Sequence, residues 1–83
     1  MDNMIIVDIE PWGHHIFVIR NTEATAVAYT GKNNEELVEF LNALGFEENI
    51  DRILVYGPEG YIDYFLDELS TSGVFNIIEV GEI

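Results

Sequence analysis

The period of the apolar residues changes near residue 30, and this change limits the chain to folds that combine a sheet with helices. Before this point, segments rich in β-branched side chains alternate with turn residues, as in consecutive strands. After it, Leu37, Phe40, Leu41 and Leu44 repeat at i, i+3, i+4 and i+7, the spacing of one helix face. The sequence therefore predicts an α/β fold.

Three strands are predicted before the change of period. Pro11-Trp12-Gly13 and Asn21-Thr22-Glu23 supply the turn-forming residues between them. Because both connections are short, neighbouring strands should pair antiparallel as a meander. The predicted strands are Met4–Glu10, His14–Arg20 and Ala24–Thr30.

Two helices and two further strands are predicted after the change. Asn33 or Asn34 suits the N-cap of the first helix, and Gly45 suits the position just beyond its end. Pro58 suits the first turn of the second helix, and Gly73 suits its end. The apolar stripe of the second helix is Tyr61, Ile62, Phe65, Leu66 and Leu69, and the strands are Arg52–Tyr56 and Val74–Val80.

This β-β-β-α-β-α-β order constrains the sheet. Strands that flank a helix should run parallel with right-handed crossovers, and the first strand, apolar on both faces, belongs in the middle. A single mixed five-stranded sheet with strand order 3-2-1-4-5 satisfies both requirements. Both crossovers then move in the same direction, so both helices cover the same face. The 83 residues are predicted to form one domain, 1–83.

The succession of three meandering strands followed by αβαβ resembles the core of the ribonuclease H-like and actin-like folds, in a truncated form. The resemblance to ribonuclease H-like nucleases implies metal-binding carboxylates on the first strand, on the first helix and at the end of the fourth strand. Asp8 matches the first position, and Glu35, Glu36 and Glu39 are available for the second. The third position fails, because Tyr56-Gly57-Pro58 stands where an aspartate is required. We therefore predict no catalytic, cofactor-binding or metal-binding residues, with a minimal metal-dependent hydrolase as the alternative.

The charge indicates which partners the chain can bind. Sixteen acidic and three basic residues give a net charge of −13, which repels nucleic acid and anionic membranes. The absence of cysteine excludes a disulfide framework, and the longest apolar run, four residues, is far too short to span a membrane. The sequence predicts a cytoplasmic protein that binds another protein with a basic surface.

Acidic residues are concentrated in the two predicted helices. In the second helix Glu59, Asp63 and Asp67 repeat at i, i+4 and i+8 beside Glu68, and the helix contains no basic residue to offset their repulsion. This arrangement fits either a solvated face or a surface that docks a basic partner, as a mimic of nucleic-acid phosphates would. The predicted acidic docking face consists of Glu59, Asp63, Asp67 and Glu68 with Glu35, Glu36 and Glu39.

The sheet face opposite the helices is predicted to be an apolar interface, because a chain of this length has nothing left to cover it. The alternation places Ile5, Val7, Ile9, Phe17 and Ile19 beneath the helices. A homodimer that joins two sheets back to back is the simplest way to cover the other face, and a different partner is the alternative. The predicted interface residues on that face are Ile6, Ile16, Val18, Val27, Tyr29, Leu54 and Tyr56.

These observations predict a non-catalytic, acidic protein-interaction module. In general character it is similar to the small inhibitors and nucleic-acid mimics made by phages and mobile elements. Two alternatives from other classes remain: the minimal hydrolase that uses Asp8 with helix carboxylates, and an accessory subunit of a larger complex.

Overall fold

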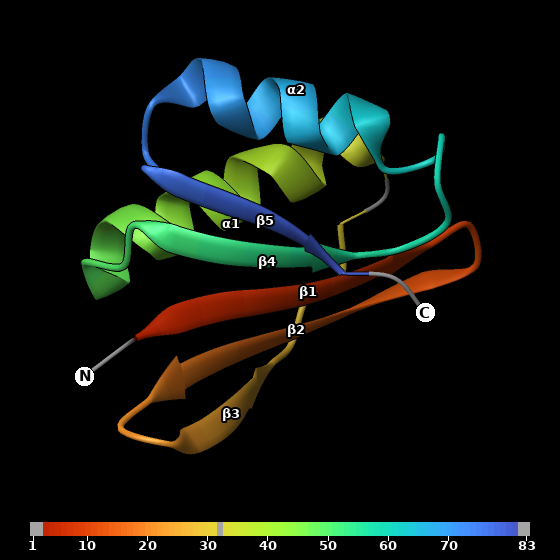
Figure 1. Cartoon of the computed structure of the whole chain (residues 1–83). Helices are drawn as coiled ribbons and strands as arrows, with labels where there is room; N and C mark the ends of the chain where they lie inside the picture. Colours follow the sequence, from red (N-terminus) through yellow and green to blue (C-terminus); the bar gives the residue numbers. More distant parts are fainter. Residues whose placement is uncertain (1–2, 32, 82–83) are drawn as a thin grey trace.

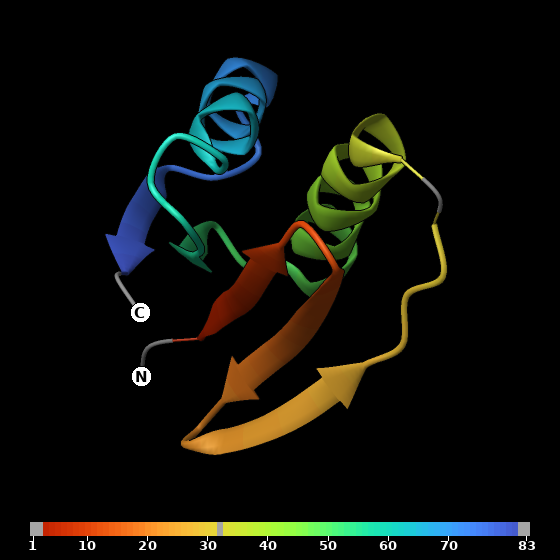
Figure 2. The same cartoon turned by 90° about the vertical axis from the view of Figure 1, so that its right-hand side faces the viewer.

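The predicted architecture is confirmed. The computed structural model describes residues 3–31 and 33–81. A five-stranded sheet has the order β3-β2-β1-β4-β5, with β1 antiparallel to β2 and parallel to β4 (Figure 1). Both helices lie on the same side of the sheet (Figure 2). The elements are β1 (Met4–Glu10), β2 (Gly13–Arg20), β3 (Glu23–Val27), α1 (Asn34–Glu48), β4 (Arg52–Tyr56), α2 (Asp63–Ser72) and β5 (Ile77–Gly81).

Two tight turns join the three antiparallel strands. Glu10 pairs with Gly13, so the first loop contains only two residues, Pro11 and Trp12. Arg20 pairs with Glu23 across a second loop of two residues, Asn21 and Thr22. Both have positive φ, 50° and 72°, as a type I′ hairpin turn requires. These loop lengths determine which side chains of β2 and β3 face the helices.

The face of the sheet beneath the helices begins with β1. Ile5, Val7 and Ile9 are fully buried there. The antiparallel register places Val18 opposite Ile5 and Ile16 opposite Val7. Directly opposed residues project to the same face, so Ile16 and Val18 also lie beneath the helices, with exposed fractions of 2% and 7%.

The predicted interface is therefore wrong for β2 and β3. Ile16 and Val18 belong to the core, and Val27 and Tyr29 pack against it from the edge of the sheet. The prediction treated Gly13 as a third loop residue. Gly13 instead opens β2, and a shift of one residue moves every side chain of a strand to the other face. Of the predicted interface, Ile6, Leu54 and Tyr56 remain on the uncovered face.

α1 begins as predicted and ends later. The Asn33 side chain caps it by accepting a hydrogen bond of 2.9 Å from the backbone N–H of Glu36. The predicted end at Gly45 is wrong, because the helix continues to Glu48 and Asn49 supplies the left-handed C-cap. Gly45 is needed inside the helix for another reason: a Cβ there would lie 2.7 Å from the ring of Phe75.

α2 ends at the predicted glycine but begins five residues after Pro58. The carbonyl of Pro58 accepts hydrogen bonds from the backbone N–H groups of Tyr61 and Ile62, so these residues form a turn and α2 starts at Asp63. Gly73, with φ of 77°, ends the helix. The last strand also starts later than predicted, at Ile77, because Phe75 turns into the core.

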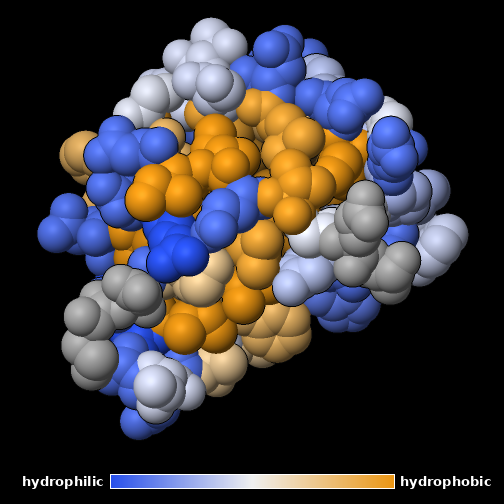
Figure 3. Space-filling model, viewed as in Figure 1, coloured by the Kyte–Doolittle hydropathy of each residue, from blue (hydrophilic) through white to orange (hydrophobic). Residues whose placement is uncertain are grey.

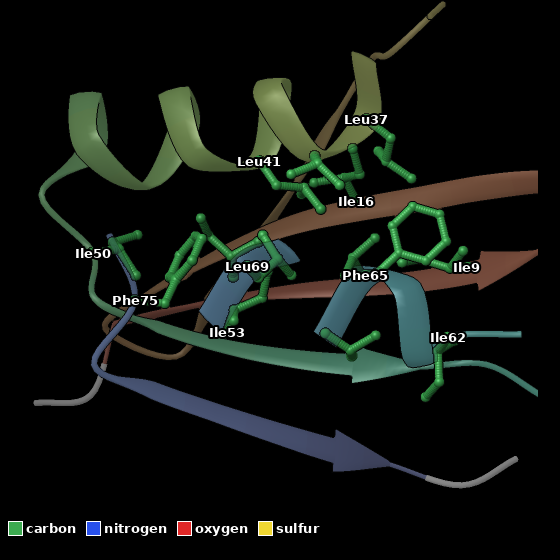
Figure 4. Packing of buried hydrophobic residues seen from close by; sticks show 14 of the residues in the cluster. Ile9, Ile16, Leu37, Leu41, Ile50, Ile53, Ile62, Phe65, Leu69 and Phe75 are labelled. Carbon is green, nitrogen blue, oxygen red and sulfur yellow. The ribbon is translucent and has the colours of Figure 1, made fainter. Parts of the chain in front are cut away.

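The core lies between the sheet and the two helices. Leu37 and Leu41 of α1 and Phe65 and Leu69 of α2 are fully buried, and their side chains point at the strands (Figure 4). Burial of a side chain of this size stabilises the fold by about 1.5–3 kcal/mol. All this apolar packing lies on one side of the sheet, so the opposite face has no cover within residues 3–31 and 33–81.

Candidate functional site

A groove between α1 and α2 brings acidic residues of both helices together. It has a volume of about 210 Å³ and is lined by Glu35, Val38 and Glu39 from α1 and by Tyr64 and Glu68 from α2. Val38 belongs to the buried face of α1, whereas the three glutamates are exposed. The groove therefore combines an apolar floor, an aromatic ring and three carboxylates. We refer to these five residues as the interhelical groove.

Nearby carboxylates help to raise the pKa values of two tyrosines. The pKa of Tyr64 is raised by desolvation and, to a smaller extent, by the negative charges of Glu68 and Glu35. The pKa of Tyr29 is raised in the same way, by desolvation and then by Glu36 and Glu39. Tyr64 can offer its ring face or its hydroxyl to a ligand in the groove.

Both arginines form ion pairs outside the interhelical groove. Arg20 forms an ion pair of 2.8 Å with Glu48, and Arg52 forms one of the same length with Glu79. Lys32 lies outside the described residues. Within the part of the chain that the structure describes, no basic side chain lines the interhelical groove.

The predicted acidic docking face is divided among several places. Glu35, Glu39 and Glu68 meet in the interhelical groove. Glu36 lies at the capped start of α1, where its carboxylate is 3.5 Å from the Asn33 amide. Asp67 is exposed on α2 and does not line the groove.

The other two residues of the predicted row lie beside β5. Glu59 precedes α2 in the turn, so the placement of this residue on the helix is wrong. Glu59 and Asp63 line a smaller cavity of about 90 Å³ together with Leu66 and Val80. Spacing along one helix predicted a single row, but the docking of α2 between α1 and β5 separates its members.

The uncovered face of the sheet is the second candidate surface. The registers place alternate residues of all five strands on it, and most of them are apolar. Figure 3 shows hydrophobic residues gathered over the strands, crossed by a few hydrophilic ones. We call this the open sheet face; its described residues are Met4, Ile6, Asp8, Glu10, His15, Phe17, Ile19, Ala24, Ala26, Arg52, Leu54, Tyr56, Ile77, Glu79 and Gly81.

Comparisons with known proteins find similarity in structure and none in sequence. No protein-family model matches the chain, and no curated protein sequence matches it. Among solved structures, the chain is similar to the Aquifex aeolicus member of the Ppx/GppA protein family, with 16% identity and a TM-score of 0.47. That similarity covers 98% of this chain and 35% of the other, so the chain spans about a third of that protein's length.

The carboxylates that a minimal metal-dependent hydrolase would need do not lie close together. Asp8 lies on the open sheet face, between His15 of β2 and Tyr56 of β4. Glu35 and Glu39 lie on α1, which covers the opposite face of the sheet. Across the described ranges, no three His, Asp or Glu side chains are grouped so that they could hold a metal ion.

Two exposed aromatic residues were missed by the sequence analysis. Trp12, at the tip of the β1–β2 hairpin, is 82% exposed, and Phe46, near the end of α1, is 81% exposed. Pro11 beside Trp12 marked the tip of a turn, which could have identified the tryptophan as exposed. No helix among the described residues is long and apolar enough to cross a membrane.

Proposed function

We propose that the protein is a non-catalytic, acidic interaction module that docks on a basic surface of a partner protein through its interhelical groove. One observation carries this proposal: Glu35, Glu39 and Glu68 converge from two helices on a concave site that also contains Tyr64 and Val38. A surface that served only to keep the protein in solution would not need an aromatic ring and an apolar side chain between its carboxylates.

The groove suits a lysine or arginine side chain. The aliphatic part of such a side chain would cover Val38, and its charged end would lie among the three carboxylates. The ring of Tyr64 adds a cation–π contact of about 0.5–1 kcal/mol at an exposed site. Each exposed ion pair contributes about 0.2–1 kcal/mol, so several contacts are needed for a stable complex.

The net charge of −13 supports the same kind of partner. A negative field of this size accelerates encounters with a positively charged protein and disfavours encounters with nucleic acid. Proteins that bind nucleic acid carry clusters of arginine and lysine. A module that occupies such a cluster with carboxylates would inhibit nucleic-acid binding by its partner.

Matched neutralisation tests this proposal. The probe is a peptide with two or three arginines, whose affinity is measured by isothermal titration calorimetry. The double variant Glu39→Gln, Glu68→Gln removes two charges from the groove, and the control Glu47→Gln, Glu59→Gln removes two charges outside it. We expect the groove variant to lose about tenfold in affinity and the control about twofold or less, since two ion pairs are worth about 1.4 kcal/mol.

Equal losses in the two double variants would contradict the proposal, because net charge alone would then explain the binding. Tyr64→Ala provides a second check that leaves the net charge unchanged. It should weaken peptide binding several-fold if the ring contacts the cation, and circular dichroism would verify that α2 remains folded.

A further inference from the structure

The outer edge of β5 has backbone groups available for another strand. β5 is the last strand of the sheet, and no strand in the described part of the chain pairs with its outer side (Figure 1). On the β4 side, the backbone N–H of Ile77 donates a hydrogen bond of 3.1 Å to the carbonyl oxygen of Asp51. Because the peptide groups of successive residues alternate in direction along a strand, those of Ile78 and Val80 point outward. This edge therefore offers the N–H and C=O groups of two residues to an incoming strand.

The side chains of β5 also favour pairing at this edge. Val80 is 53% exposed and Ile77 is 49% exposed, although both are large and apolar. The strand Ile77–Gly81 contains neither lysine nor proline, the residues that commonly prevent pairing at sheet edges. At the opposite edge of the sheet, β3 exposes the small side chains of Ala24 and Ala26. The edge of β5 is therefore the better of the two for binding another strand.

A cavity beside this edge indicates which side chain an incoming strand would carry. It has a volume of about 90 Å³, and its apolar wall includes Ile62, Leu66 and Val80. Glu59 and Asp63 also line it, and both carboxylates are exposed. No basic side chain in the part of the chain that the structure describes lines this cavity. A lysine or arginine fits, because its aliphatic part would cover the apolar wall while its charged end reaches the carboxylates.

We propose that β5 binds an extended segment of a partner protein as a sixth strand, with a lysine or arginine of that segment in the cavity. Val80 is in register with the buried Val55, so its side chain projects to the face covered by the helices. The residue of the added strand that lies beside Val80 projects to the same face and reaches the cavity. The backbone hydrogen bonds provide affinity, and the cavity provides specificity.

Charge favours a different protein over a second copy of this chain. β5 contains no basic residue, so β5 of a second copy could not supply the cation that the cavity suits. A second chain of charge −13 would also add long-range repulsion. The expected occupant is therefore a positively charged partner whose extended segment has apolar residues on both sides of the lysine or arginine.

Amide hydrogen exchange, measured by nuclear magnetic resonance, tests the added strand. The probe is a short peptide of alternating threonine and valine in which lysine replaces the central valine. In the protein alone, the outward N–H groups of Ile78 and Val80 should exchange rapidly, whereas those of Ile77 and Glu79 are protected by β4. Saturating peptide should slow exchange at Ile78 and Val80 by about tenfold or more.

Matched variants separate the backbone contacts from the cavity. Val80→Pro removes an outward N–H and no hydrogen bond to β4, so it should weaken peptide binding about tenfold while the protein stays folded. Val80→Thr keeps the N–H and is the control, with an expected change of twofold or less. Asp63→Asn should weaken the lysine peptide several-fold and leave a peptide with methionine in place of lysine unchanged. Thermal melting establishes that each variant is folded.

Three results would overturn the inference. They are unchanged exchange at Ile78 and Val80 when peptide is added, equal binding of the lysine peptide and of a peptide with glutamate in its place, and a dimer of the protein alone that Val80→Pro abolishes. The last result would make a second copy the occupant.

The outcome at β5 is independent of the interhelical groove. A peptide of arginines alone has no apolar residues to place along β5, so it reports on the groove. Conversely, the groove variant Glu39→Gln, Glu68→Gln should bind the threonine–valine–lysine peptide within about twofold of the wild type, because neither residue lines the cavity beside β5. Either proposal can therefore fail while the other holds.

Discussion

Val7 of β1 lies directly opposite Ile16 of β2, and both side chains are buried beneath the helices. This pairing follows from the two-residue loop between the strands, because each added loop residue would exchange the two faces of β2. The hairpin therefore assigns one half of its apolar residues to the core and the other half to the open sheet face.

The first prediction concerns this assignment. Ile16→Ala should lower the free energy of unfolding by about 2–4 kcal/mol, because it creates a cavity in the core. Phe17→Ala should cost only about 1–2 kcal/mol, because the larger side chain it removes is only half-buried. Urea unfolding at low protein concentration measures both. A greater loss for Phe17→Ala would contradict the register.

The second prediction concerns Gly45. Alanine normally stabilises a helix interior by about 1 kcal/mol relative to glycine. Here its Cβ would lie 2.7 Å from the ring of Phe75 and 3.1 Å from the carbonyl oxygen of Ile50. Gly45→Ala should therefore reduce stability by about 1–2 kcal/mol in thermal unfolding.

A smaller residue at position 75 provides the control for this prediction. Adding Phe75→Leu to Gly45→Ala should cost less than the sum of the two single changes, because the leucine no longer occupies the space that the new methyl group needs. Strict additivity would show that the close approach to Phe75 is not the cause.

The strand order and the face covered by the helices could be predicted because they depend on local patterns and on crossover handedness. The side chains of β2 that face the helices could not be predicted. They depend on whether Gly13 belongs to the loop or to the strand, and glycine is compatible with both. The end of α1 was missed because Gly45 is required by Phe75, which lies thirty residues away. The groove could not be predicted from spacing along one helix, because it depends on how α2 packs beside α1. This packing places Glu68 in the same groove as Glu35.

The third prediction concerns His14 and pH. Burial, and to a lesser extent the charge of His15, lowers the pKa of His14 below its ordinary value of about 6.5. As the pH falls below that value, the unfolded chain binds a proton that the folded chain resists, so this contribution to stability is lost on acidification. The thermal midpoint of His14→Gln relative to the wild type should therefore rise between pH 7.5 and pH 5.5. A difference that does not change with pH would contradict this.

The fourth prediction concerns salt. With a net charge of −13, the folded chain repels itself, and a few hundred millimolar NaCl should screen this repulsion. The thermal midpoint should rise between low salt and that concentration. A midpoint that falls instead would mean that the ion pairs of Arg20 and Arg52 outweigh the repulsion.

Nuclear magnetic resonance can show whether basic side chains bind in the interhelical groove. Amide shifts of the ¹⁵N-labelled protein would be followed while an arginine-containing peptide is added. The largest changes are expected at Glu35, Val38, Glu39, Tyr64 and Glu68, and the acidic segment 47–51 should change little. Shifts spread evenly over all acidic residues, or concentrated on segment 47–51, would contradict it.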